Sequence, residues 1–164
     1  MKVVVLSSAR CGGRYFCEQL ALNHNLTLYH EPDIDTINYV VDKDNIIVKT
    51  VVNLPFHYDT KKIIEYTKSF DTIFLLTRRN NEDHLVSLYN ILEISQDMYT
   101  KYFWDETNEK HIKEITKYQE FIDDLNKCLK EISYRLNEDI IYYEDLYYKT
   151  ETVNLKGLKF KPDL

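Results

Sequence analysis

The 164-residue chain has little glycine, proline or cysteine, with three of each. Cys11, Cys17 and Cys128 are odd in number and lack paired spacing, which argues against a disulfide framework and for a reducing compartment such as the cytoplasm. No apolar run approaches the roughly 20 residues of a membrane span, and residues 3–6 are too few for a signal-peptide core. A net charge of −6 disfavours a broad nucleic-acid surface. We therefore expect a cytoplasmic protein with neither a membrane nor a nucleic-acid partner, although a local basic pocket is compatible with this charge.

The patterning that is present predicts one α/β domain over residues 1–164, because no linker, repeat or composition shift divides the chain. Short β-branched apolar runs predict strands at residues 2–8, 26–32, 45–52, 71–77 and 139–143. Apolar residues at helical spacing predict helices at residues 14–23, 60–69, 82–96 and 108–136. This alternation implies right-handed crossovers and a three-layer α/β/α fold around a parallel sheet of about five strands.

Two of the three glycines, Gly12 and Gly13, follow the first predicted strand and lie between Arg10 and Arg14 in "LSSARCGGRYF". A strand, a glycine turn and a helix start form a phosphate-binding geometry, because glycine allows close approach and the helix offers unpaired N–H groups. The alternative is a tight turn with two surface arginines. The stretch is not a Walker A loop, which would need Lys at Arg14 and Ser or Thr at Tyr15.

A second segment, "RNNEDHLVSLYN", places Arg79 at a strand end and Ser87 about a turn and a half into the next helix. A forked guanidinium and a hydroxyl are suited to hold one further phosphate group together.

The chain resembles the sulfotransferases that use 3'-phosphoadenosine 5'-phosphosulfate (PAPS). "SSARCGGRYF" is similar to that family's 5'-phosphosulfate loop, S-x-P-R-S-G-[ST]-T. Arg10 and Gly12 match, whereas Cys11 replaces Ser, and Gly13 and Arg14 replace hydroxyl residues.

Three further segments carry the resemblance. Arg79, Asp83 and Ser87 match the 3'-phosphate segment R-[DN]-P-x-[DE]-x-x-x-S, with Asn in place of Pro. Lys49 and Thr50 match the Lys-Thr strand of cytosolic members, and "YEDL" matches a late strand end. We find no clear counterpart of the segment that closes over the 3'-phosphate in cytosolic members; "LKGLKF" is a faint candidate.

The resemblance implies a P-loop-like, nucleotide-kinase-like fold with strand order 2-3-1-4-5. It implies sulfuryl transfer from PAPS to an acceptor hydroxyl on a small molecule or glycan, without a metal. The donor-binding residues that it implies are Arg10, Cys11, Gly12, Gly13, Arg14, Tyr15, Arg79 and Ser87. The chain does not indicate the acceptor's identity or its own oligomeric state.

The catalytic residues that we expect are Lys49, at the bridging oxygen or leaving phosphate, and a base after the second strand. Val51 stands where cytosolic members have a His, so Glu31 is the expected base, and His30 is its rival. An exposed acid before the turn at Pro32, a buried histidine and a solvated strand-end lysine are the corresponding structural alternatives. We expect a partly dry cleft to raise the pKa of Glu31 toward neutrality.

Other polar residues receive structural interpretations. Glu144 and Asp145 of "YEDL" are expected to cap a helix or to pair with a loop arginine, and His84 is expected at the surface. The aromatic stretch at residues 97–106 is either an acceptor-binding flap, a core plug or an oligomer contact. The rival functions are an ATP-dependent small-molecule kinase and a catalytically silent nucleotide-binding protein of the same fold.

Overall fold

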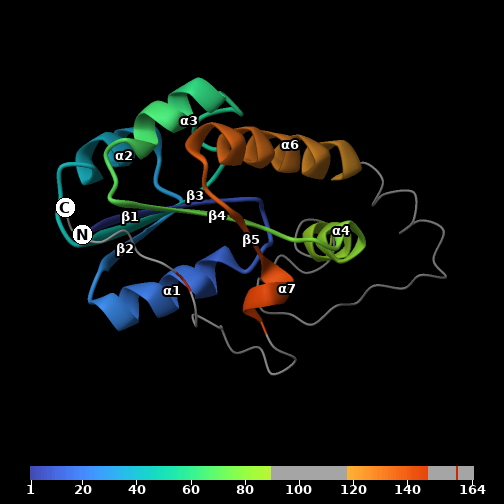
Figure 1. The fold of residues 1–164 in the computed structure, drawn as a ribbon, viewed down its shortest axis with the longest axis horizontal. Helices are drawn as coiled ribbons and strands as arrows, with labels where there is room; N and C mark the ends of the chain where they lie inside the picture. The colour runs from blue at the N-terminus through green and yellow to red at the C-terminus, as the bar shows by residue number, and fades with distance from the viewer. Residues whose placement is uncertain (90–117, 148–157, 159–164) are drawn as a thin grey trace.

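The computed structural model describes residues 1–89, 118–147 and 158, and Figure 1 shows their arrangement. The elements in chain order are β1 (Lys2–Ser7), α1 (Gly13–His24), β2 (Thr27–His30), α2 (Ile34–Val40), β3 (Ile46–Val51), α3 (Thr60–Thr67), β4 (Thr72–Thr77), α4 (Asn81–Tyr89), α6 (Gln119–Leu136), β5 (Ile140–Tyr142) and α7 (Tyr143–Leu146).

The five strands form one parallel sheet in the order β2-β3-β1-β4-β5. The predicted fold class and strand order are therefore confirmed. β1 is central and has neighbours on both edges, which explains why its apolar run is continuous rather than alternating. Its four apolar residues, 3–6, are fully buried.

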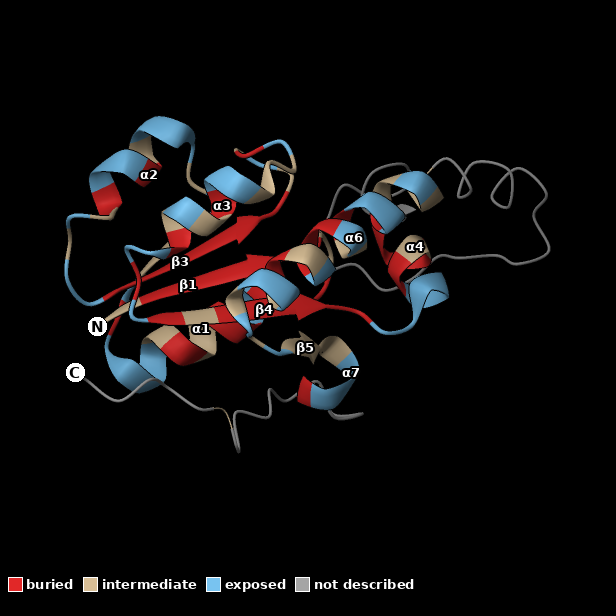
Figure 2. Cartoon of the chain, turned by 45° about the horizontal axis from the view of Figure 1, so that its top comes forward, coloured by how far each residue is buried: buried red, intermediate tan, exposed pale blue. Residues whose placement is uncertain are grey.

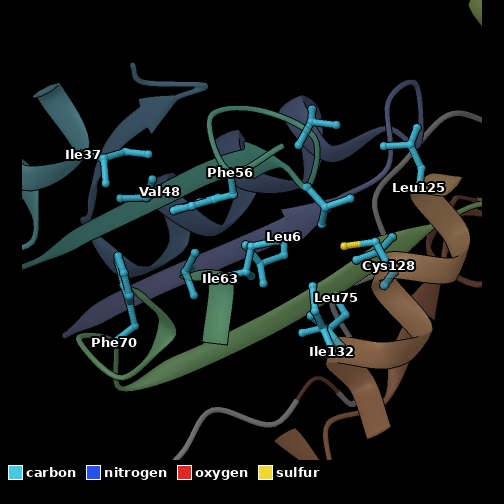
Figure 3. Close-up of a cluster of buried hydrophobic side chains, with 14 of the residues drawn as sticks. Leu6, Ile37, Val48, Phe56, Ile63, Phe70, Leu75, Leu125, Cys128 and Ile132 are labelled. Carbon is cyan, nitrogen blue, oxygen red and sulfur yellow. The ribbon is translucent and has the colours of Figure 1, made fainter. Parts of the chain in front are cut away.

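Helices cover both faces of the sheet (Figure 1). Val4 and Leu6 of β1 point into a core closed by α2, α3 and α6, which Figure 3 shows in close-up. Val3 and Val5 point to the opposite face, where α1 and α7 close a second core. Figure 2 shows the central strands β1, β3 and β4 buried between these layers, so the polar ends of these strands are the part that ligands can reach.

Two short helices were missed by the sequence interpretation. α2 begins after Asp33, whose side chain accepts from the backbone N–H of Thr36 at 2.8 Å, and α7 has only four residues. Such short segments show too few turns for a helical period to stand out. α3, which the sequence did predict, is capped by Asp59, whose side chain accepts from the N–H of Lys62 at 3.1 Å.

Parts of several predictions lie outside the described residues: the end of the helix at 82–96, the start of the helix at 108–136, the aromatic stretch at 97–106, and all of "LKGLKF" except Leu158. Within the described part of the chain, no helix combines the length and apolar character that a membrane span requires.

Candidate functional site

The turn after β1, residues 8–13, is termed the glycine loop. Its backbone is left-handed at Arg10 (φ 56°) and at Gly12 (φ 74°), which is the N-cap of α1 and makes no side-chain cap bond. No acidic residue occupies the first turn of α1. Left-handed residues beside an uncapped helix start turn successive N–H groups toward one point, which suits an anion.

Cys11 contributes to the glycine loop through its backbone rather than its thiol. The side chain is buried in the α1 core, and Sγ donates to the carbonyl of Ser8 at 3.1 Å. Burial raises the pKa of this thiol, although the nearby Lys49 opposes the rise. The thiol is therefore held protonated and inert.

Tyr147, which directly follows α7, lies against the glycine loop. Its hydroxyl donates to the carbonyl of Gly12, and a Cβ at that position would be 2.6 Å from the Tyr147 ring. The Tyr143 ring stacks on Tyr147 with centroids 4.4 Å apart. Glycine is thus required at position 12 for two reasons, the positive φ and the close approach of the Tyr147 ring. No spacing in the sequence indicated that Tyr147 would be its partner.

Helix α4 is fixed to the glycine loop by two side chains one turn apart. The Nε of Arg10 donates to Oγ of Ser87 at 3.3 Å, and Nε2 of His84 donates to the carbonyl of Ala9. The structure therefore brings Arg10 and Ser87, two predicted donor-binding residues from distant segments, into direct contact.

The expected surface position of His84 was wrong, because its side chain is fully buried. Burial lowers its pKa to about 4, while the hydrogen bond to Ala9 opposes the shift. The imidazole is therefore neutral at pH 7, with the Nε2 proton directed at the loop.

Arg79 does not hydrogen-bond Ser87 and instead pairs with α7. Its Nη1 and Nη2 donate to the two oxygens of Asp145 at 3.1 and 2.6 Å, and its guanidinium lies 4.5 Å from the Tyr142 ring centroid. Glu144 accepts from the backbone N–H groups of Arg79 (2.9 Å) and Asn80 (3.0 Å). The structural interpretation of Glu144 and Asp145 agrees with these bonds.

Lys49 is buried at the end of β3, with 5% of its surface exposed, so the solvated-lysine alternative was wrong. Its ammonium donates to Oε1 of Glu31, and its Cε lies 3.1 Å from where a Cβ of Gly13 would be. Lys49 thus runs between Glu31 and the start of α1.

The expected rise in the pKa of Glu31 was also wrong. Burial raises that pKa, but the charge and hydrogen bond of Lys49 outweigh burial and lower it below its usual range. Glu31 has a left-handed backbone (φ 49°), and its N–H donates to the carbonyl of Lys49 at 2.7 Å. His30 Nε2 is 4.0 Å from Oε1 of Glu31, and its own pKa is lowered by burial and by Lys49. Both candidate bases therefore belong to one charge cluster.

Arg14 and Tyr15 lie exposed on the first turn of α1. The Nε of Arg14 donates to Glu18 of the same helix at 2.9 Å, and the Tyr15 ring centroid is 6.2 Å from that of Tyr147. Arg14 and Tyr15 therefore do not supply the lysine and the small hydroxyl that a P-loop has at these two positions.

Arg78 was overlooked because its exposed neighbour Arg79 matched a motif. Arg78 is 7% exposed, Nη1 donates to the carbonyl of Asp83 at 3.2 Å, and Nε has no hydrogen-bond partner among the residues that the structure describes. The guanidinium also lies 4.1 Å from the Tyr143 ring centroid. The burial of this strand-end arginine is set by the fold and is not visible in the sequence pattern.

Together these side chains can hold an anion and position a proton acceptor near it. Arg10 and the loop N–H groups supply donors, and Lys49 supplies a charge beside a carboxylate. Among the described residues, no three His, Cys, Asp or Glu side chains gather as a metal site, and metal-free chemistry stays a prediction.

No family model and no curated protein matches the sequence. Solved structures do match: the YorR protein of Bacillus subtilis in complex with phosphorylated GDP is 11% identical, with a TM-score of 0.51 over 87% of this chain and 84% of YorR. Shikimate kinase from Bacteroides thetaiotaomicron is 10% identical, with a TM-score of 0.44 over 84% of this chain and 98% of the kinase. The similarity to YorR is one of fold, and the chain has a P-loop-like α/β fold with a five-stranded parallel sheet.

Proposed function

We propose that the protein is a nucleotide-dependent transferase that moves a sulfuryl group from PAPS to an acceptor hydroxyl. The observation that carries this proposal is the 3.3 Å hydrogen bond from Arg10 to Ser87, which are 77 residues apart. If one residue serves the 5' end of a nucleotide and the other its 3'-phosphate, the two must lie near one ligand, and their direct hydrogen bond supports such a shared site.

In this proposal the glycine loop and Arg10 bind the 5'-phosphosulfate, and Lys49 neutralises charge on the leaving phosphate oxygen. Glu31 takes the acceptor proton while the acceptor oxygen bonds to sulfur and the sulfur–phosphate oxygen bond breaks. The lowered pKa of Glu31 makes it a weak base while Lys49 is bound to it. An anion at the loop would draw Lys49 away, and the carboxylate would then gain basicity.

A second candidate is an ATP-dependent small-molecule kinase, which the fold similarity to YorR favours. Because that structure holds phosphorylated GDP, guanine nucleotides belong in the test alongside ATP. Against this candidate stand Arg14 and Tyr15, at the positions where a P-loop has its Lys and its magnesium-binding hydroxyl.

The test is calorimetric titration with adenosine 3',5'-bisphosphate, AMP, ATP and GTP, each with and without magnesium. We expect the bisphosphate to bind roughly 10- to 150-fold more tightly than AMP without magnesium, and Arg10→Ala to remove most of that affinity. Equal affinity for the bisphosphate and AMP would reject the 3'-phosphate assignment, and magnesium-dependent ATP or GTP binding would select the kinase. Release of labelled product from PAPS then separates an enzyme from a silent binding protein.

A further inference from the structure

A cavity of about 540 Å³ opens where β4 ends, between α6 and β5. Its size is that of a small-molecule site. We propose that this cavity binds a small phosphate or sulfate ester, as a second ligand separate from the nucleotide at the glycine loop.

The charge of the lining carries the first part of this inference. Arg78, Arg79, Lys127 and Lys130 line the cavity, and Asp123 is the one carboxylate among the described lining residues. Asp123 already accepts from the side chain of Gln119 at 2.9 Å. Asp145, which is not part of the lining, already pairs with Arg79, so the excess positive charge comes from Arg78, Lys127 and Lys130. In a chain of net charge −6, these three cations form a local positive site that suits an oxyanion.

Arg78 carries the second part. It is more than nine-tenths buried, and within residues 1–89 and 118–147 no carboxylate forms an ion pair with it. The charge of Arg78 contributes to lowering the pKa of Glu144, but both Glu144 oxygens accept hydrogen bonds from backbone N–H groups and not from Arg78. The Tyr143 ring compensates the charge only in part. A buried cation without a counter-charge is costly, and a bound oxyanion would supply one.

The uncharged lining indicates what the anion is attached to. Ile140 and the Tyr142 ring form an apolar wall, and Asn81 and Asn126 bring amide groups. Oδ1 of Asn126 accepts from Thr77 at 2.7 Å, and Nδ2 donates one of its two hydrogens to Oδ1 of Asn81 at 3.5 Å, so the second hydrogen is the one available to an anion. An apolar wall beside cations suits an ester with an organic body better than a free ion.

The cavity is separate from the glycine loop. Among the described residues that line it, none belongs to residues 8–13. The boundary is a hydrogen-bonded row in which Ser8 Oγ and Thr77 Oγ1 are 2.9 Å apart and Thr77 contacts Asn126. A ligand in the cavity is therefore not the phosphate chain bound by Arg10.

The experiment is a titration of the whole protein with phenyl phosphate, phenyl sulfate and inorganic phosphate, followed by calorimetry. The test variant is Lys127→Gln/Lys130→Gln, and the matched control is Lys61→Gln/Lys62→Gln, which removes the same charge from exposed positions on α3. We expect at least one phenyl ester to bind more tightly than inorganic phosphate. We expect roughly 10-fold weaker ester binding in the test variant and unchanged binding in the control and in Arg10→Ala.

Three results would overturn the inference: no ester binding at millimolar concentration, equal binding in the test variant and the wild type, or inorganic phosphate binding as well as the esters. Loss of ester binding in Arg10→Ala, or competition with AMP, would also overturn it by moving the ligand to the loop. AMP is the competitor because it has no 3'-phosphate that could reach Arg79, which also lines the cavity. The inference does not depend on PAPS, because the ester site can exist whether or not the bisphosphate binds.

Discussion

A buried cation lies on each side of the glycine loop, Lys49 on the β3 side and Arg78 on the β4 side, and the two differ in whether a carboxylate neutralises them. On the β3 side, Lys49 is neutralised by Glu31 from the same chain, and an incoming anion must compete with that carboxylate. On the β4 side, Arg78 is equally buried but has no carboxylate partner in the described part of the chain. The β3 side is therefore built so that a ligand changes the state of a base, whereas the β4 side is built to attract a negative charge.

The largest effect that separates the two sides is expected from Glu31→Gln. If the β3 side performs proton transfer, this variant slows sulfuryl transfer by about 10²- to 10⁴-fold, the usual range for a lost general base. Nucleotide affinity stays within a few-fold, because the amide leaves Lys49 in place. The measurement is product formation from labelled PAPS with an acceptor found by screening. Near-normal turnover would remove Glu31 from the mechanism and make His30→Asn the next variant.

The second effect tests whether the stability of the folded protein depends on His84, on the β4 side, being neutral. Since the pKa of His84 falls from 6.5 to about 4 on folding, the unfolded chain binds the proton more readily. The stabilisation is complete above pH 6.5 and is lost as the pH falls toward 4, by roughly 3 kcal/mol in all. His84→Gln keeps a donor toward Ala9 without this titration, so its stability should fall less between pH 7 and 4.5 in urea unfolding. The control is His24→Gln at an exposed position, which should follow the wild type.

Much of this architecture could be predicted from sequence, for reasons that also explain the failures. The strands were found because both faces of a central parallel strand such as β1 are buried, which leaves a continuous apolar run. The sequence placed Arg10 and Ser87 among the donor-binding residues but paired Ser87 with Arg79, whereas in the structure Ser87 bonds Arg10 and Arg79 bonds Asp145. The resemblance to sulfotransferases supplied the roles, and these stay predictions.

What sequence could not reveal depended on partners distant in the chain. The burial of His84 and its bond to Ala9 join residues 75 apart, and Tyr147 reaches Gly12 across 135. The pKa of Glu31 was expected in the wrong direction because the position of Lys49 relative to the second strand end is set by the β2–β3 register. Arg78 and Arg79 are adjacent in sequence, yet Arg78 is 7% exposed and the Arg79 side chain 56%, a difference that the sequence pattern does not show.

The third effect compares the stability cost of adding a methyl group at Gly12, which lies against Tyr147, and at Gly13, which lies against Lys49. Gly12→Ala forces a side chain into φ 74° and against the Tyr147 ring at 2.6 Å, and should cost roughly 1–3 kcal/mol of stability. A Cβ on Gly13 would be close only to the flexible Lys49 stem at 3.1 Å, while Cys11 and Leu76 would be at ordinary contact distances of 3.6 Å. Gly13→Ala should therefore change stability by less than about 1 kcal/mol. Denaturant unfolding of the two variants measures the difference. Equal losses would contradict a rigid β4 side and an adaptable β3 side.

The smallest effect concerns Arg79, which the resemblance to sulfotransferases assigns to the 3'-phosphate although Asp145 holds it. Both side chains of this ion pair are 56% exposed, and such exposed pairs contribute little to stability. Asp145→Asn should therefore release Arg79 at little cost in stability and tighten adenosine 3',5'-bisphosphate binding by roughly 1.5- to 5-fold. AMP is the matched control, because without a 3'-phosphate it should bind the variant and the wild type equally. Weaker bisphosphate binding would mean that Asp145 orients Arg79 for the ligand, and an equal gain for AMP would mean that the added charge acts on the whole β4 side rather than on the 3'-phosphate.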